Sequence, residues 1–362
     1  METPLPSPAL SPEFRFMVAC CKALVEPSSR SDLAGQLGAV DLTTLTALAR
    51  RHRVEGIVWN ALRSAGIDID TPALGPLAAE ARSISQQGLR AAAESMRLQS
   101  AFAAAGIDLL FLKGLTVGAL AYGNAFVKMS WDIDVLVAPV DVAAAANVLK
   151  QLGYRCGSPG EQVDLVRWHV ANKESVWHEE GGVHHVELHS RLSDNRALIP
   201  TIGMTSPRQM VMIAPGVVLP TLATGELFAY LCVHGASSAW FRLKWVADFA
   251  GLLRGRDGDE IEQLYRRSQG LGAGRSAAQA LLVADALFGL PLPPALLAEL
   301  RGNAANRWLA AAALHELAAG REPTKRRLGT AMIHLTQMLL KPGLSFGWNE
   351  FRRQARAAIA NR

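Results

Sequence analysis

Two aspartates stand two residues apart in an apolar segment of this 362-residue chain, and their type and spacing suit a metal ion. They are Asp132 and Asp134 in the sequence Trp131-Asp-Ile-Asp-Val-Leu-Val137. Residues two apart on a β-strand project to the same side of the sheet. Two carboxylates held together in this way repel each other, so a partly buried pair needs a nearby cation. The pair therefore predicts a site for a divalent cation such as Mg²⁺.

A glycine turn precedes the acidic strand. Leu110-Phe-Leu112 predicts a strand, Lys113-Gly114 a turn, and the residues through Tyr122 a helix. Glycine lets the backbone approach a ligand closely, and a helix N-terminus presents free N–H groups with a partial positive charge. We expect Gly114 and the following amides to contact phosphate groups, and Lys113 to neutralise charge on them. A strand, a turn, a helix and an acidic strand in this order indicate a site that handles phosphates.

These residues belong to a longer pattern, over roughly residues 85 to 255, that resembles the uncharacterised nucleotidyltransferase family of the polymerase-β-type nucleotidyltransferase superfamily. The matching fragments are Leu112-Lys-Gly114, Lys128, Asp132-x-Asp134, Leu152-Gly-Tyr154, Val186-Glu-Leu-His-Ser-Arg191, Cys232-x-His234 and Trp240 to Asp248. Two positions depart from the pattern. Lys128 stands where arginine is expected, and Trp131 stands where a small glycine is expected. We expect Trp131 either to narrow the site or to stack on a base.

The resemblance implies an α+β fold, in which a small mixed β-sheet nucleotidyltransferase core is flanked by N-terminal and C-terminal helical regions. It also implies Mg²⁺-dependent transfer of a nucleoside monophosphate from an NTP, in the first place ATP, to a hydroxyl or phosphate acceptor. Asp132, Asp134 and Glu187 would hold the metal as catalytic acids. Glu187 would reach the pair from a neighbouring antiparallel strand and help to deprotonate the acceptor. Similar proteins are often encoded near genes for peptide natural products or surface polysaccharides, which suggests a modified peptide or a sugar as acceptor.

Further side chains are implied by the resemblance to contact the substrates. Lys128 is expected to be a second phosphate contact, by similarity alone. His189 and Arg191 follow the third acid on the same segment and are expected to face the substrate.

A downstream helix carries two more basic candidates. The segment from Trp240 to Asp248 predicts a helix from which Lys244 would contact the nucleotide and Arg242 would face the substrate. Lys244 and Asp248 are also spaced to form an ion pair on the surface of the helix, which is the simpler alternative.

The histidines permit a different hypothesis, a zinc site. His185, Glu187 and His189 alternate along one strand and could be drawn as a His-x-Glu-x-His motif. A zinc deaminase would need Pro-Cys-x-x-Cys downstream, and a zinc protease would need His-Glu-x-x-His on a helix. The sequence has neither motif, since its four cysteines are Cys20, Cys21, Cys156 and Cys232. The magnesium hypothesis is therefore favoured.

The remaining pattern predicts four regions. They are a disordered, Pro- and Ser-rich N-terminus (1–12), an N-terminal helical region (13–105), the nucleotidyltransferase core (106–221), and a C-terminal helical region with a basic tail (222–362). Within the core we expect a helix over 139–152, a loop over 155–165, a Gly-Gly hairpin over 174–188, and a short strand over 217–219.

Composition places the protein in a broad class. Half of the residues are hydrophobic, and no apolar stretch reaches the roughly 20 residues of a membrane span. We therefore expect a soluble protein without a membrane span. The N-terminus lacks the pattern of a secretory signal and the cysteines make no disulfide framework, so we expect a cytoplasmic location.

Positive charge is concentrated at the C-terminal end. The net charge of the chain is +5, and nine lysines and arginines face two glutamates between Arg321 and Arg362. This tail could bind an acidic partner, such as an acidic peptide or an anionic surface, although a solvated outer face is the simpler explanation. Nucleic acid is not the expected partner, because no RNA-binding signature or recognition helix is present.

Two other functions remain open from the sequence. The chain could be a catalytically inactive module that binds a nucleotide or a partner in the same cleft, or an antitoxin-like regulator of a protein partner. A toxin-sized reading frame beside the gene would favour the second, and turnover would exclude the first.

Overall fold

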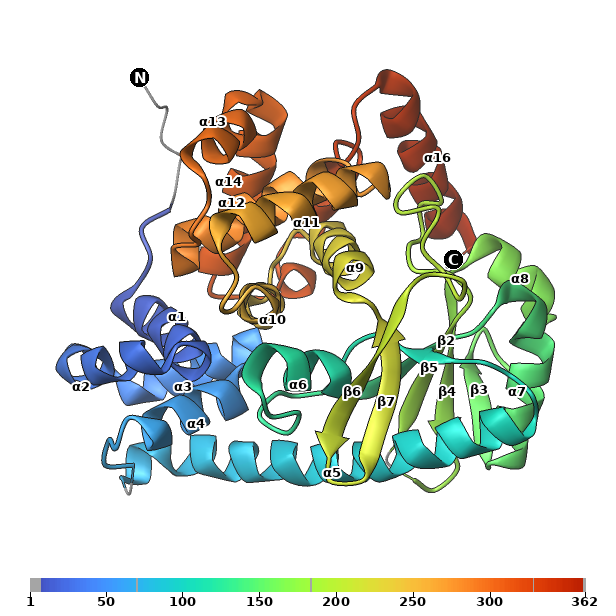
Figure 1. Ribbon diagram of the computed structural model, residues 1–362, viewed down its shortest axis with the longest axis horizontal. Helices are drawn as coiled ribbons and strands as arrows, with labels where there is room; N and C mark the ends of the chain where they lie inside the picture. The colour runs from blue at the N-terminus through green and yellow to red at the C-terminus, as the bar shows by residue number, and fades with distance from the viewer. Residues whose placement is uncertain (1–7, 70, 183, 328, 361–362) are drawn as a thin grey trace. The chain divides into compact units, whose positions relative to one another are not determined.

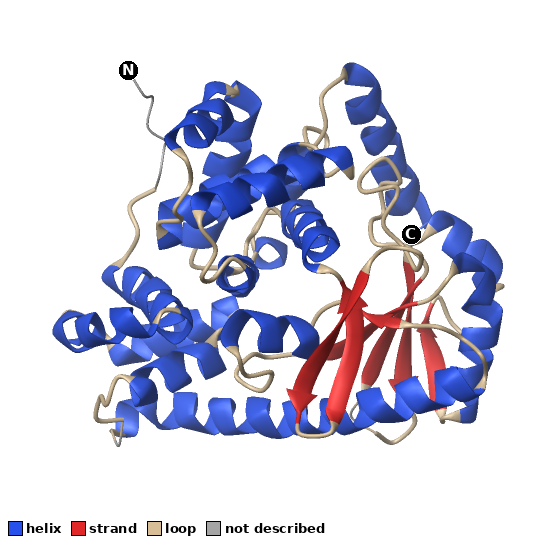
Figure 2. Ribbon diagram, in the orientation of Figure 1, coloured by secondary structure: helices blue, strands red, loops and turns tan. Residues whose placement is uncertain are grey.

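The computed structural model describes residues 8–69, 71–182, 184–327 and 329–360, and the chain divides into two compact units (Figure 1). One unit is Arg82–Leu227, and the other combines Met1–Ala81 with Phe228–Arg362. Every strand of the described residues lies in Arg82–Leu227, which we call the sheet unit (Figure 2). The other is the helical unit. The expected disordered N-terminus falls mostly on residues 1–7, outside the described residues.

The helical unit is built from helices before and after the sheet unit in sequence. Its described helices are α1 (Pro12–Val25), α2 (Ser31–Leu37), α3 (Leu42–His52), α4 (Glu55–Ser64), α10 (Leu243–Leu252), α11 (Gly258–Gly270), α12 (Arg275–Phe288), α13 (Pro294–Gly302), α14 (Ala304–Ala318), α15 (Ala331–Gln337) and α16 (Leu344–Ala360). The division between the units falls within α5 (Gly75–Ala104) and α9 (Thr224–Ser237). All residues from Ser276 to Ala284 are buried, so α12 is enclosed on every side. It contacts α1, α10, α11, α13 and α14.

The sheet unit is a mixed α+β structure, as expected. Its elements after α5 are β1 (Leu110–Phe111), α6 (Leu115–Tyr122), β2 (Asp132–Leu136), α7 (Val142–Gln151), β3 (Tyr154–Ser158), α8 (Leu165–Ala171), β4 (Glu174–Glu179), β5 (His185–His189), β6 (Arg208–Ala214) and β7 (Val217–Leu222). Five strands form one sheet in the order β1-β2-β5-β4-β3, and β6 and β7 form a separate hairpin. The predicted strand, glycine turn, helix and acidic strand are β1, Lys113-Gly114, α6 and β2.

The strand that carries Glu187 runs parallel to the acidic strand, and the expectation of an antiparallel neighbour was wrong. The chain leaves β2 through α7, a crossover that lets β3 run in the same direction as β2. Two successive antiparallel connections, from β3 through α8 to β4 and from β4 to β5, then restore that direction in β5. Direct pairing of Asp134 with Glu187 follows from this topology.

The two faces of the sheet differ in polarity because side chains alternate along each strand. Ile133 and Val135 of β2 and Val186 and Leu188 of β5 are buried in one apolar cluster. Residues of α5, α7 and the β6–β7 hairpin complete this cluster. The alternate residues of β2 and β5, which include both aspartates, lie on the opposite face.

One prediction about local structure was wrong, and another was incomplete. Residues 155–158 belong to strand β3 rather than to a loop, with only Tyr154 and Cys156 buried along it. The predicted strand over 217–219 is longer, and its partner β6 was not predicted. In β6 the methionines Met210 and Met212 are exposed, so its hydrophobic pattern does not alternate as that of a half-buried strand should.

The basic tail is partly neutralised within the helical unit. Arg326 forms an ion pair with Glu316, and Arg353 forms one with Glu350 at 2.6 Å. An acidic partner for this tail stays a prediction. Among the described residues, no helix is both long and apolar enough to cross a membrane.

The apolar face of the sheet should govern the stability of the sheet unit. Leu188→Ala removes a fully buried side chain of the central strand β5, and we expect it to lower the free energy of unfolding by about 2–5 kcal/mol. Leu89→Ala makes the same change at a side chain of α5 that is 57% exposed, and should alter stability by about 0.5 kcal/mol or less. Urea unfolding measures both; equal effects of the two substitutions would contradict this description of the core.

Candidate functional site

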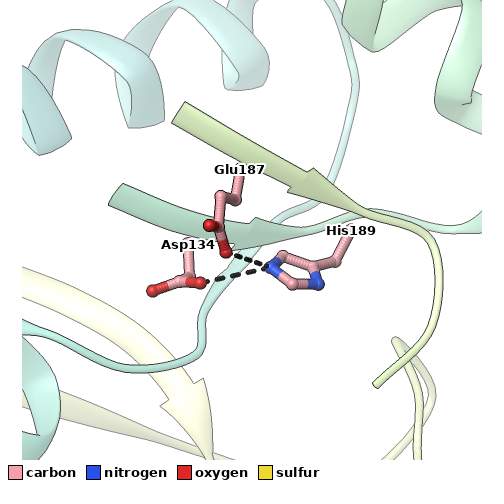
Figure 3. A group of neighbouring side chains, drawn as sticks. All are labelled: Asp134, Glu187 and His189. Carbon is pink, nitrogen blue, oxygen red and sulfur yellow. Dashed lines mark hydrogen bonds and ion pairs between the residues drawn. The ribbon is translucent and has the colours of Figure 1, made fainter. Parts of the chain in front are cut away.

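Three side chains that could hold a metal ion converge on the polar face of the sheet. They are Asp134 of β2 and Glu187 and His189 of β5, and their ligand atoms all lie within 4.8 Å of one another. The imidazole contacts both carboxylates through one nitrogen, with His189 Nε2 at 3.2 Å from Asp134 Oδ1 and 3.4 Å from Glu187 Oε2 (Figure 3). The parallel register explains the cluster, because it pairs Asp134 with Glu187 and places His189 two residues further along the same face.

Lys113 supplies a positive charge to this cluster. Its Nζ lies 2.7 Å from Asp134 Oδ1 and 3.9 Å from Glu187 Oε2. The backbone brings it there, since the N–H of Leu112 donates to the carbonyl oxygen of Asp134 at 3.0 Å. Lys113, the residue after Leu112, is therefore held beside Asp134.

The charges around Asp134 decide its ionisation. Its side chain is only 6% exposed, and burial alone would favour the neutral acid. The ammonium of Lys113 and the hydrogen bond from His189 outweigh burial and hold the pKa of Asp134 well below its usual range. Asp134 is therefore held as a buried anion beside the ammonium of Lys113 and the imidazole of His189.

The pKa values of Glu187 and His189, the partners of Asp134, are raised rather than lowered. Burial raises the pKa of Glu187 above its usual value, and the charge of Asp134 raises it further. Burial opposes the charged imidazole of His189, but its hydrogen bonds to Asp134 and Glu187 prevail and raise the pKa of His189. The cluster thus favours negative charge on Asp134 and positive charge on His189.

Sequence reasoning missed a fourth acid, Glu174 of β4. Its Oε2 lies 3.2 Å from His189 Nδ1, an ion-pair contact rather than a hydrogen bond, and the same carboxylate pairs with Lys173. Glu174 pairs with His189 in the β4–β5 register. Its place in the predicted hairpin was the available signal, because residues opposite each other in adjacent strands share a face.

The turn at Gly114 requires glycine for two reasons. Its φ of +66° is unfavourable for other residues, and a Cβ there would lie 2.5 Å from the side-chain oxygen of Ser130. The hydroxyl of Ser130 donates to the carbonyl oxygen of Asp132 at 3.1 Å. The start of α6 and the segment that leads into β2 therefore approach each other closely at Gly114.

A small pocket brings most of the predicted phosphate and metal residues together. We call it the glycine-turn pocket; its walls include Lys113, Gly114, Ser130, Asp132 and Asp134. Asp132 lies at the first residue of β2, half-buried and outside the group of three potential ligands around Asp134. The catalytic and metal-binding roles of these side chains stay predictions.

Lys128 and Arg191 each contact other parts of the sheet unit. Lys128 is buried, with its aliphatic Cδ close to Gly118 of α6. The guanidinium of Arg191 donates to the carbonyl oxygens of His169 and Ala171, each at 2.7 Å, and so braces the C-terminal turn of α8. Their contacts with a substrate stay predictions.

Arg242 and Lys244 belong to the helical unit. Arg242 precedes α10, forms an ion pair with Glu322 at 2.8 Å, and lies over the rings of Phe241 and Trp245. Lys244 is the second residue of α10. Their predicted roles toward nucleotide and substrate are likewise untested.

Comparison with known proteins agrees with the resemblance seen in the sequence. Curated proteins give no match. A family model described as uncharacterised nucleotidyltransferase matches residues 38–289, which is more than half of the 362 residues. The matched segment contains the glycine turn, β2 and β5, and so the whole cluster around Asp134. The chain therefore belongs to the uncharacterised nucleotidyltransferase family.

Proposed function

We propose that this protein is a Mg²⁺-dependent nucleotidyltransferase that moves a nucleoside monophosphate from an NTP, in the first place ATP, to a hydroxyl or phosphate acceptor. Family membership supports nucleotidyl transfer as the general type of reaction. The observation that carries the proposal is the meeting of Asp134, Glu187 and Lys113 beside the glycine turn. A modified peptide or a sugar is the proposed acceptor.

The donor atoms at the site fit a divalent cation. Carboxylate oxygens from Asp132, Asp134 and Glu187 are the ligands that Mg²⁺ prefers. The nitrogen of His189 widens the range of suitable ions to Mn²⁺ and Zn²⁺. We assign the acids to Mg²⁺, and His189 to holding the carboxylates of Asp134 and Glu187 in place through the contacts of its Nε2. A bound ion would neutralise charge on the transferred phosphate.

Each of the protein's own groups then has a separate role in the reaction. The amides at the start of α6 bind phosphate oxygens, which Gly114 lets approach the backbone. Lys113 neutralises charge on the same phosphates. Glu187 accepts the proton of the acceptor hydroxyl, whose oxygen bonds to the α-phosphorus while the bond to the β-phosphate breaks. Pyrophosphate leaves with the electron pair of that bond, in line with the attacking oxygen.

Removal of the buried anion should abolish metal-dependent nucleotide binding. Asp134→Asn keeps the shape of the side chain but loses its charge, so we expect the affinity for Mg²⁺·ATP to fall at least about tenfold and pyrophosphate release to stop. Isothermal titration calorimetry and a pyrophosphate assay with candidate peptide and sugar acceptors measure the two effects.

A matched control is Asp194→Asn, which makes the same change at an exposed position of the sheet unit. It should bind Mg²⁺·ATP like the unaltered protein. Unchanged binding in folded Asp134→Asn would contradict the metal site. Binding without turnover for any acceptor would favour the inactive-module alternative.

The glycine turn gives a second test, with inorganic tripolyphosphate as the probe. Gly114→Ala should weaken binding of Mg²⁺·tripolyphosphate about tenfold or more, because the new methyl group meets Ser130 and displaces the turn from the phosphates. Gly123→Ala also places an alanine at a positive φ, +68°, at the other end of α6, in the left-handed helical region and with no atom within 4 Å of the new Cβ. It should leave binding unchanged.

A double variant separates displacement of the turn from general damage to the fold. Ser130→Ala removes the oxygen that the Gly114→Ala methyl would meet, so adding it should restore part of the lost affinity. A Gly114→Ala protein that binds tripolyphosphate normally would show that the turn does not bind phosphate.

A further inference from the structure

A second, larger pocket adjoins the glycine-turn pocket within the sheet unit. Its volume is about 290 Å³, and its distinctive lining residues are Gln87, Arg90, Trp131, His184 and His185. We call it the Trp131 pocket. Ala91, Ser130 and Ile133 line both pockets, so the two hollows share a wall. The two hollows are therefore adjacent.

Trp131 gives this pocket an exposed aromatic surface. The side chain is 49% exposed, whereas Trp177 of the same unit is fully buried. Exposure of a large indole is costly in water, and an indole with an accessible face is a good platform for a planar ring. Trp131 immediately precedes Asp132, so this platform lies one residue from the predicted metal-binding strand.

Polar groups around the indole suit the edge of a nucleobase. Gln87 and Arg90 come from α5 at helical spacing, and thus lie on the same side of that helix. An amide offers both a donor and an acceptor, and a guanidinium offers several donors. His184 and His185 contribute imidazoles at the start of β5. One stacking surface and several edge groups are what a small aromatic heterocycle requires.

We propose that the Trp131 pocket binds the nucleoside part of the NTP, with the base stacked on Trp131; this inference rests on the proposed function. Two observations favour the nucleoside over the acceptor. The pocket shares its wall with the glycine-turn pocket, as the nucleoside must be continuous with its phosphates, and Glu187 and His189 do not line it. Its volume lies near the lower end of the roughly 300–1,000 Å³ of small-molecule sites.

Calorimetry with two probes tests the assignment. Mg²⁺·ATP carries the nucleoside, and Mg²⁺·tripolyphosphate carries the phosphates alone. Trp131→Ala should weaken Mg²⁺·ATP binding about tenfold and leave Mg²⁺·tripolyphosphate binding unchanged, because stacking on the base is the only interaction removed. Trp131→Phe retains an aromatic ring and should keep most of the affinity for ATP.

Trp348→Ala is the matched control, since it truncates a tryptophan of α16 that is 60% exposed. It should bind both probes like the unaltered protein. Equal loss of both probes in Trp131→Ala, or no loss of either, would overturn the nucleoside pocket while the phosphate site stands. If the unaltered protein binds ATP no more tightly than tripolyphosphate, the nucleoside pocket is overturned in the same way. Failure of the unaltered protein to bind either probe would overturn the proposed function as well.

Discussion

The buried carboxylate of Asp134 is the constraint around which the sheet unit is organised. An ionised acid with 6% exposure requires positive charge and hydrogen bonds close to it, or burial would neutralise it. Lys113 follows β1 in the chain, and His189 lies on β5. Lys113 Nζ is 2.7 Å and His189 Nε2 is 3.2 Å from the same oxygen, Asp134 Oδ1. The segments that carry these two partners, the turn after β1 and the strand β5, are both positioned by pairing with β2.

The apolar face of the sheet fixes the geometry of the polar face. Val135, Val186 and Leu188 are fully buried on one side, so β2 and β5 cannot slip by one residue without moving them into the polar site. The same register keeps Asp134 opposite Glu187. Packing far from the chemistry therefore determines the separation of the two acids. The site needs no long flexible loop to bring its acids together.

Local features of the site could be predicted from the sequence, because they depend on neighbouring residues. The spacing of Asp132 and Asp134 predicted a shared strand face, and Lys113-Gly114 predicted the turn before α6. The Gly-Gly hairpin was also predicted, and the structure confirms it as β4 and β5. The α+β fold and the family followed from the resemblance and are confirmed.

What could not be predicted depends on pairing between distant segments. The parallel direction of β5 follows from the crossover through α7 and the extra strand β3, which carries only two buried side chains. Without β3, one fewer reversal of chain direction separates β2 from β5, and β5 is then expected to run antiparallel to β2. Glu174 was missed for a different reason, because its pairing with His189 follows from the β4–β5 register of the predicted hairpin, and that register was not worked out residue by residue. Strand β6 was not predicted, because its exposed methionines break the alternation of polar and apolar residues that marks a half-buried strand.

The contacts of His189 with Asp134 and Glu187 also bear on how a nucleotide would bind under the proposed function. Lys113 lies beside both acids, and a protonated His189 would add a second positive charge to the cluster. A metal ion alone would then meet acids that already have cationic partners. An NTP arriving with its metal would bring negative phosphates for Lys113, so the ammonium could exchange Asp134 for phosphate oxygens while the ion took its place beside the acids. Under the proposed function, charge balance would therefore favour binding of metal and triphosphate as one complex over binding of the metal first.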